Sequence, residues 1–276
     1  MGIKANLVAG LPVIMLTATA GLAVDCHTHR ATMAQTTAPR PNQNARLAER
    51  HAMVTRQVEA RGVTDSRVLS ALRAVPRHVF VPAQLQSEAY ADTPLPIGYN
   101  QTISQPFIVG YMTEALQLTE NARVLEVGTG SGYQAAVLAE VADTVFTIEI
   151  IAELAERASS VLTNLGYRNV DVRSGDGYHG WAEEGPFDGI LVAAAPDHVP
   201  PALIEQLAIG GRLVIPVGSD GRGTQAMTIV TRTSQSHTVE TTFPVRFVPM
   251  TGRARGTKDT PEERDPPVER LSSSPH

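Results

Sequence analysis

One stretch decides the fold of this chain: VLEVGTGSGY, residues 124–133. Its apolar start is typical of a buried strand. The glycines at 128, 130 and 132 allow positive φ angles and let the main chain touch a ligand where a Cβ would intervene. A helix predicted over residues 133–140 would point its first N–H groups at that ligand. The stretch therefore predicts a strand, a ligand-binding turn and a helix.

The spacing of the glycines narrows the kind of ligand. A dinucleotide fingerprint has its third glycine three residues after the second, where this chain has Tyr133. Glu149 follows the apolar run TVFTI, residues 144–148, where a carboxylate would accept hydrogen bonds from a ribose diol. Both nicotinamide cofactors and S-adenosylmethionine carry that diol, so the pattern indicates a nucleotide-like cofactor. A packed strand, turn and helix without a ligand is the alternative.

Length and composition limit the possible functions. The 276 residues, 42% of them hydrophobic, suffice for one large domain with appendages. A net charge of −5, with Lys and Arg scattered singly, argues against an electrostatic grip on nucleic acid. The single cysteine, Cys26, excludes an intramolecular disulfide and a thiolate metal cluster. The histidines lack ligand spacing, so we interpret them as surface or loop residues and predict no metal site.

The two ends of the chain differ from its middle. Lys4 precedes an uncharged run over residues 5–24 that is typical of a secretory signal and too interrupted for a transmembrane helix. A disordered extension is the alternative, because residues 28–44 show no periodicity. We therefore expect a leader or disordered extension over 1–44, a folded domain over 45–252 and a disordered tail over 253–276.

The folded domain begins with helices. A helical period over residues 44–60 and a second helix, capped at Thr64–Asp65 and ending at Val75, predict a small cap over 45–76. Prolines and a glycine between residues 79 and 102 predict a long loop. Ser104 can then cap a helix that runs to about Leu116.

The remainder alternates strands with helices. Strands are predicted at 123–128, 144–149, 170–173, 187–193 and 212–217, and helices at 133–140, 151–165 and 200–207. Such alternation indicates parallel strands with helices on both sheet faces. Two further strands, at 225–232 and 238–248, would close the edge as an antiparallel pair. The fold class is therefore α/β, a doubly wound and mostly parallel sheet with an antiparallel C-terminal edge and a small N-terminal helical cap. Ligands of such sheets lie beyond the carboxyl ends of the strands.

Six segments together resemble the protein-L-isoaspartate O-methyltransferase family, whose members are class I S-adenosylmethionine-dependent methyltransferases with a Rossmann-like fold. The segments are QTISQP (101–106), VLEVGTGSGY (124–133), GDG (175–177), PFDGILV (186–192), GGRLVIPVG (210–218) and VRFVP (245–249). The glycine motif alone suggests only the class, whereas TISQP ahead of it is more specific. The resemblance covers residues 45–253, and both tails depart from it.

The resemblance implies a reaction and a set of site residues. Methyl transfer from S-adenosylmethionine to the α-carboxylate of an L-isoaspartyl residue would give an ester that closes to a succinimide. In this family Ser104 would orient the substrate carboxylate. The residues implied to bind the cofactor are Gly128, Thr129, Gly130, Gly132, Glu149, which would hold the ribose, and Asp176 with Gly177, which would face the adenine. The residues expected in the peptide groove are Thr102, Val245, Phe247 and Val248.

Other functions remain open at this point. A non-catalytic S-adenosylmethionine sensor, or a methyltransferase for another carboxylate or a small molecule, would share the cofactor motif. A nucleic-acid methyltransferase is disfavoured, because AAAP at 193–196 lacks the polar-aromatic signature used for exocyclic amines. The expected partners are proteins that contain L-isoaspartyl residues, with no nucleic acid and no stable membrane association. We expect a monomer in the cytoplasm, where S-adenosylmethionine is made, with export as the alternative.

Overall fold

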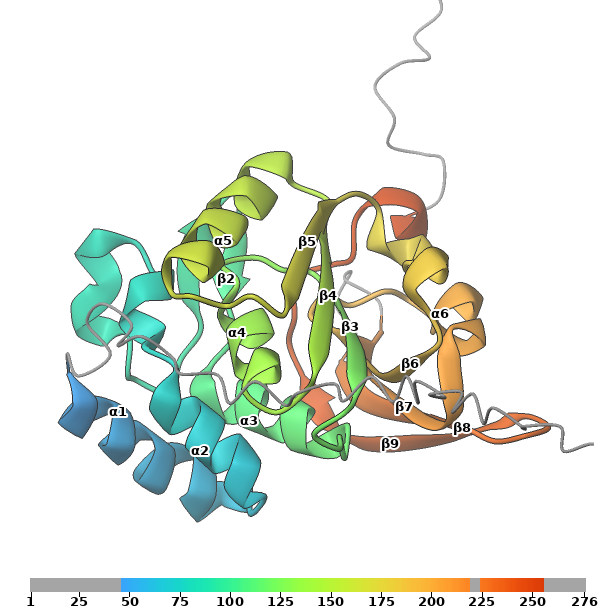
Figure 1. Cartoon of the computed structure of the whole chain (residues 1–276), viewed down its shortest axis with the longest axis horizontal. Coiled ribbons are helices and arrows are strands. Elements are labelled where there is room, and N and C mark those ends of the chain that lie inside the picture. The colour runs from blue at the N-terminus through green and yellow to red at the C-terminus, as the bar shows by residue number, and fades with distance from the viewer. Residues whose placement is uncertain (1–45, 219–223, 256–276) are drawn as a thin grey trace, which may run out of the picture. The chain divides into compact units, whose positions relative to one another are not determined.

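The computed structural model describes residues 46–218 and 224–255 (Figure 1). The predicted leader or extension lies outside these residues, as does the predicted tail beyond residue 255. The start of that tail differs from the prediction, because Gly252–Arg255 form a 3-10 helix of the folded domain. None of the helices in the described ranges is both long and apolar enough to span a membrane.

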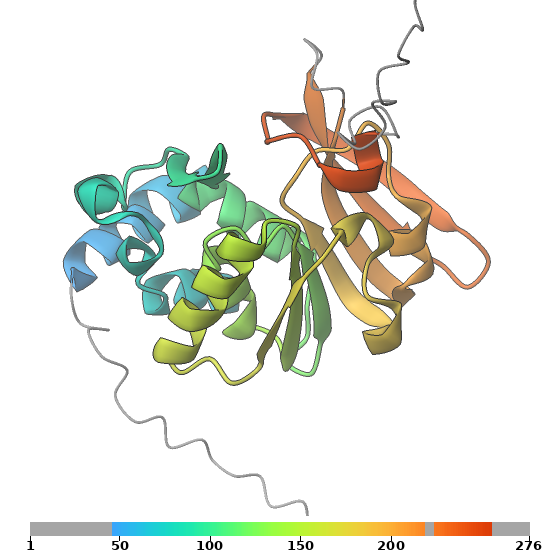
Figure 2. The same cartoon turned by 90° about the horizontal axis from the view of Figure 1, so that it is seen from above.

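A seven-stranded sheet organises the domain (Figures 1 and 2). Its spatial order is β5 (Val170–Ser174), β4 (Thr144–Glu149), β3 (Arg123–Val127), β6 (Phe187–Val192), β7 (Leu207–Val217), β8 (Gln225–Arg232) and β9 (His237–Val245). The first five strands are parallel, and β8 and β9 add an antiparallel edge. This confirms the predicted fold class. The strand order reverses between β3 and β6, which lie side by side.

Alternate side chains of the strands enter two hydrophobic clusters, one on each sheet face. The first includes Val124, Val145, Leu191 and Val214, and it is covered by α4 (Tyr133–Ala139) and α5 (Ala152–Asn164). The second includes Leu125, Phe146, Ile190 and Leu213, and it is covered by α6 (Pro201–Glu205). Helices on both faces follow from this alternation, because each face buries its own apolar side chains.

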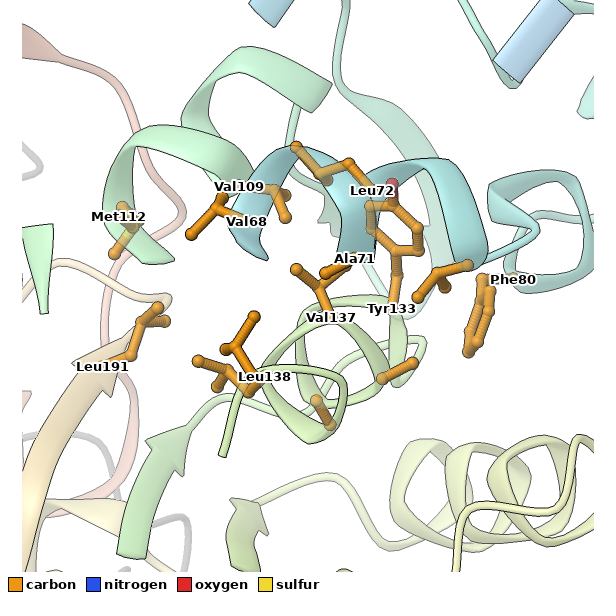
Figure 3. Close-up of a cluster of buried hydrophobic side chains, with 14 of the residues drawn as sticks. Val68, Ala71, Leu72, Phe80, Val109, Met112, Tyr133, Val137, Leu138 and Leu191 are labelled. Atoms are coloured by element: carbon orange, nitrogen blue, oxygen red, sulfur yellow. The ribbon is translucent and has the colours of Figure 1, made fainter. Parts of the chain in front are cut away.

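The N-terminal helical cap packs on the first face. Its helices are α1 (Leu47–Met53) and α2 (Ser66–Ala74), which pack together, and α2 also packs with α3 (Pro106–Ala115). Figure 3 shows Val68, Ala71 and Leu72 of α2 beside Val137 and Leu138 of α4, and all five side chains are buried. The predicted helix over 44–60 is less regular than expected, since α1 continues as a π-helix, Val54–Val58, and a 3-10 turn, Glu59–Arg61.

The predicted loop over residues 79–102 contains regular structure. It holds a 3-10 helix, Ala83–Glu88, and a hairpin of β1 (Leu95–Gly98) and β2 (Gln101–Ile103). Tyr99 and Asn100 join the two strands with positive φ angles of 51° and 56°, as in a tight two-residue hairpin turn. The strands are too short, and too rich in proline, for their alternation to stand out. His78, which we expected on a surface or loop, is buried, and its Nδ1 lies 2.7 Å from the Tyr90 hydroxyl.

Strand β7 begins five residues earlier than its predicted start at residue 212, because a glycine pair is accommodated inside it. Gly210 and Gly211 occupy an irregularity in the pairing with β6. A Cβ on Gly211 would lie 2.9–3.0 Å from three main-chain oxygens, so the glycines permit close approach of two backbones instead of ending the strand. The edge strand β9 ends at Val245, whereas the sequence predicted a strand that continues to residue 248.

Candidate active site

A cavity lies where the strand order reverses, beyond the carboxyl ends of β3 and β6. Ligands of open α/β sheets bind at this position. Its walls come from the β1–β2 hairpin and the segment after it, the glycine turn, the ends of β4 and β5, the segment after β6, and residues 248–251. Nine of the predicted site residues line it: Thr102, Ser104, Gly128, Thr129, Gly130, Glu149, Asp176, Gly177 and Val248. We call it the donor cavity.

The glycine turn joins β3 to α4 in a conformation that other residues rarely adopt. Gly128 and Gly130 have φ angles of 95° and 54°, and both line the donor cavity. Gly132, with φ of 87° and also predicted to bind the cofactor, does not line the donor cavity. It precedes α4, and a Cβ there would lie 3.3 Å from atoms of Ala158 and Leu162 in α5. Gly132 therefore allows α4 and α5 to pack closely.

Glu149 is the last residue of β4, and its side chain binds the main chain of the glycine turn. Its carboxylate is buried, with Oε2 accepting from the Gly130 N–H at 2.8 Å and Oε1 from the Ile151 N–H at 3.0 Å. Each carboxylate oxygen can accept a further hydrogen bond, so both remain able to receive a ribose hydroxyl. The residue thus fixes the turn and faces the cavity at once.

Glu126 lies in β3 underneath the same turn and does not line the cavity. Its Oε2 accepts from the Thr147 hydroxyl at 2.6 Å, and the Thr147 and Thr129 hydroxyls are also 2.6 Å apart. Burial raises the pKa of Glu126 to about 8, with the Thr147 hydrogen bond opposing the rise and Glu149 adding to it. Glu126 is therefore mostly protonated near neutral pH.

Asp176 caps a short turn after β5 and lines the donor cavity together with Gly177. Its Oδ1 accepts from the Tyr178 N–H at 2.9 Å, and its Oδ2 accepts from the Arg253 N–H at the same distance. Gly177 admits no side chain, because a Cβ would lie 2.3 Å from Cγ1 of Val127. Asp176 thus stabilises the turn and also faces the donor cavity. Its carboxylate further anchors the segment Gly252–Arg255.

Ser104 does not cap α3, which was the alternative explanation for a serine at this position. The N-cap residue is Gln105, and Oδ1 of the distant Asp92 accepts from the Phe107 N–H at 3.0 Å. The half-buried Ser104 hydroxyl makes no hydrogen bond to a residue in the described part of the chain. It is therefore available to a ligand.

A second cavity adjoins the donor cavity, and we call it the acceptor cavity. It is lined by Pro94, Thr102, Ser104, Gln105, Ile108, Ala193, Arg246, Phe247 and Val248. Thr102, Ser104, Ala193 and Val248 line both cavities and form a shared wall. Phe247 lines only the acceptor cavity. Val245, predicted in the peptide groove, lines neither and packs against the first hydrophobic cluster.

Two residues outside the predicted set hold the segment that carries Phe247 and Val248. The buried Gln225 accepts from the Phe247 N–H at 2.5 Å and donates to the Phe247 carbonyl at 3.0 Å. Ala195 donates its N–H to Val248 at 2.9 Å and accepts from the Met250 N–H at 2.8 Å. No motif marks Gln225, because its partner lies 22 residues away and is main chain.

A carboxylate and an open glycine turn facing one cavity at the reversal of a doubly wound sheet suit S-adenosylmethionine, and the chain is a class I S-adenosylmethionine-dependent methyltransferase. Residues 48–255 match the family model of protein-L-isoaspartate(D-aspartate) O-methyltransferase, and the chain belongs to that family.

Relatives and solved structures agree with this assignment. A protein-L-isoaspartate O-methyltransferase of Picosynechococcus is 56% identical over 210 residues, covering 76% of this chain and 93% of its own length. The enzyme of that name from Gloeobacter violaceus is 57% identical over 199 residues, covering 72% and 97%. A solved protein-L-isoaspartate O-methyltransferase has a TM-score of 0.68 at 28% identity, covering 75% of this chain and 66% of that one. A Plasmodium falciparum structure in complex with S-adenosyl-L-homocysteine, 24% identical with a TM-score of 0.63, shares the fold.

Proposed function

We propose that this protein transfers a methyl group from S-adenosylmethionine to the α-carboxylate of L-isoaspartyl residues in damaged proteins. The product is a methyl ester that converts to a succinimide, so the reaction starts repair. Family membership supports the reaction. The observation that carries it is the shared wall, where the Ser104 hydroxyl borders both the donor and the acceptor cavity and has no hydrogen-bond partner among residues 46–218 and 224–255.

The donor side of the site is built for binding and not for chemistry. S-adenosylmethionine, when bound, supplies a methyl group on a positively charged sulfur. Glu149 accepts hydrogen bonds from the ribose hydroxyls, while Gly128 and Gly130 let the main chain approach the methionine part. Asp176 and Gly177, which line the same cavity, would face the adenine. The turn is held in place before binding by the bond from the Gly130 N–H to Glu149.

The acceptor side needs orientation more than it needs a base. A carboxylate has a reference pKa of about 4, so it is already ionised near neutral pH. The Ser104 hydroxyl donates to one carboxylate oxygen and leaves the other free to attack in line with the methyl group. Thr102, Phe247 and Val248 surround the peptide. Val248, held by Ala195, gives the groove a fixed main-chain edge.

One assay separates this function from the alternatives. Labelled S-adenosylmethionine is incubated with two peptides that differ only in carrying L-isoaspartate or aspartate at one position. Base-labile label on the isoaspartyl peptide alone is the expected result. Cofactor binding with no transfer to either peptide would favour a sensor. Equal labelling of both peptides, or of free carboxylic acids only, would favour a methyltransferase with another acceptor.

We also propose that the enzyme acts as a cytoplasmic monomer without stable association with nucleic acid or membrane. Supply of S-adenosylmethionine supports the cytoplasm, because an exported enzyme would lack its donor. Cell fractionation with N-terminal sequencing of the mature chain tests the location, and a start after Ala20, Ala23 or Ala34 in an exported fraction would contradict it. Sedimentation of the purified protein tests the monomer.

A further inference from the structure

One residue that lines the acceptor cavity differs in kind from the others, the cationic Arg246. Among the described residues that line this cavity, Arg246 alone is charged. Its side chain is exposed and forms no ion pair with a carboxylate in the described parts of the chain. In a protein with a net charge of −5, an uncompensated cation at a binding cavity points to an anionic ligand.

The main chain next to Arg246 is fixed. The neighbouring Phe247 is held at both its N–H and its carbonyl by the buried Gln225. One residue further on, the Val248 carbonyl is bound by the Ala195 N–H. The main chain that carries the Arg246 side chain is therefore anchored to β8 and to the segment after β6, while the exposed end of the side chain can reach along a bound peptide.

The chemistry of methyl transfer argues that this anion is not the acceptor carboxylate. The negative charge of that carboxylate disappears as the carbon–oxygen bond forms, and the positive charge of the sulfonium disappears as the carbon–sulfur bond breaks. A guanidinium paired with the attacking carboxylate would stabilise the ground state more than the transition state and slow the reaction. A neutral donor such as Ser104 suits the acceptor better.

We propose that Arg246 binds an acidic side chain of the substrate close to the isoaspartyl residue. The planar guanidinium matches a carboxylate through two parallel hydrogen bonds. The enzyme then selects, among damaged segments, those with a neighbouring Glu or Asp. This inference rests on the proposed function and names the substrate class that the same site prefers.

The experiment uses isoaspartyl peptides that are identical except for Glu, Gln or Lys at one of the two positions on either side of the isoaspartate. The measured quantity is the ratio of kcat/KM for the Glu peptide to that for the Gln peptide, taken within each variant so that differences in folding cancel. For at least one position the full-length wild type should give a ratio of about 3, the size expected of an exposed ion pair. High salt should reduce it.

Three variants decide the outcome. Arg246→Gln should bring the ratio to about 1, Arg246→Lys should keep most of it, and Arg246→Glu should shift the preference to the Lys peptide. A wild-type ratio of 1 at all four positions, or an Arg246→Gln variant that keeps the wild-type ratio, would overturn the proposal. Failure of the proposed function is distinguishable, because the Gln peptide itself would then remain unmethylated.

Discussion

At the scale of single residues, Ser104 is the most informative position. Since Asp92 caps α3, removing the Ser104 hydroxyl should leave the helix intact. We expect Ser104→Ala to lower kcat about tenfold or more, as loss of one aligned donor does. The melting temperature should stay within about 2 °C. Steady-state kinetics with an isoaspartyl peptide and thermal unfolding measure the two effects.

Calorimetric titration with S-adenosylhomocysteine is the control for Ser104→Ala. Cofactor affinity should change by no more than about threefold, because the neighbouring glycine turn and Glu149 are untouched. Unchanged turnover would remove Ser104 from the mechanism.

Glu126 gives a second prediction at this scale, one of pH dependence. The folded protein keeps Glu126 protonated up to a pKa of about 8, whereas a free glutamate releases its proton near 4.5. Between these values the folded state binds more protons than the unfolded state, so the stabilising contribution falls as the pH rises. We expect the free energy of unfolding to decline more steeply between pH 5.5 and about pH 8 in the wild type than in Glu126→Gln, by up to about 1.4 kcal/mol per pH unit.

Urea denaturation at several pH values measures this difference, since Glu126→Gln keeps the shape of the side chain and lacks the titrating group. Parallel stability curves for the two proteins would show that Glu126 is ionised in the folded state across this range.

At the scale of elements, Asp92 connects the segment after the 3-10 helix Ala83–Glu88 to the start of α3. It accepts from the Phe107 N–H and forms an ion pair of 2.6 Å with Arg61. We expect Asp92→Ala to cost about 1–2 kcal/mol of stability through the lost cap. It should also raise KM for the peptide, because the QTISQP segment leads directly into this helix. Chemical denaturation and peptide kinetics measure both.

Arg61→Gln is the matched control for Asp92→Ala. It removes the ion pair and the stacking of the Arg61 guanidinium on the Phe107 ring, at a cost of about 1–2 kcal/mol, and keeps the cap. Equal effects of the two substitutions on KM for the peptide would assign the role of Asp92 to the ion pair instead of the cap.

The element scale also shows what can be predicted from sequence. Continuous apolar runs located the parallel strands β3, β4 and β6, because helices on both sides of the sheet bury both faces of these strands. Alternation of polar and apolar residues located the strand at 225–232 on the antiparallel edge. The β1–β2 hairpin was not predicted, since strands of four and three residues are too short to show a period. The glycine pair at 210–211 reads as a strand boundary, yet it permits backbone contact inside β7.

The candidate site divides in the same way. Residues that one motif brings together, such as Gly128, Gly130 and Glu149, were placed at one cavity from spacing alone. The contacts from Asp92 to Phe107 and from Gln225 to Phe247 join residues 15 and 22 positions apart through side chain and main chain. Such bonds leave no local pattern, so the acceptor side could be predicted only by resemblance.

At the scale of the whole molecule, the extent of the functional domain is testable. We propose that the functional domain extends to residue 255 instead of the predicted 252, because the Arg253 N–H binds Asp176 at the donor cavity. We expect a protein spanning residues 45–255 to keep the specific activity of the full chain. One ending at residue 251 should bind S-adenosylhomocysteine about fivefold or more weakly, through loss of this bond to a charged group.

Titration calorimetry on the two truncated proteins and the full chain compares the affinities. Equal affinity in both truncated proteins would show that the anchor on Asp176 is dispensable for cofactor binding.

The wall of Thr102, Ser104, Ala193 and Val248 between the two cavities has a thermodynamic consequence. A ligand that orders these four residues from one side lowers the entropy cost for a ligand arriving on the other. Such cooperativity is reciprocal: the factor by which a bound peptide tightens S-adenosylhomocysteine must equal the factor by which S-adenosylhomocysteine tightens the peptide. Coupling through this wall would therefore make the affinity for the peptide depend on whether the donor cavity is occupied.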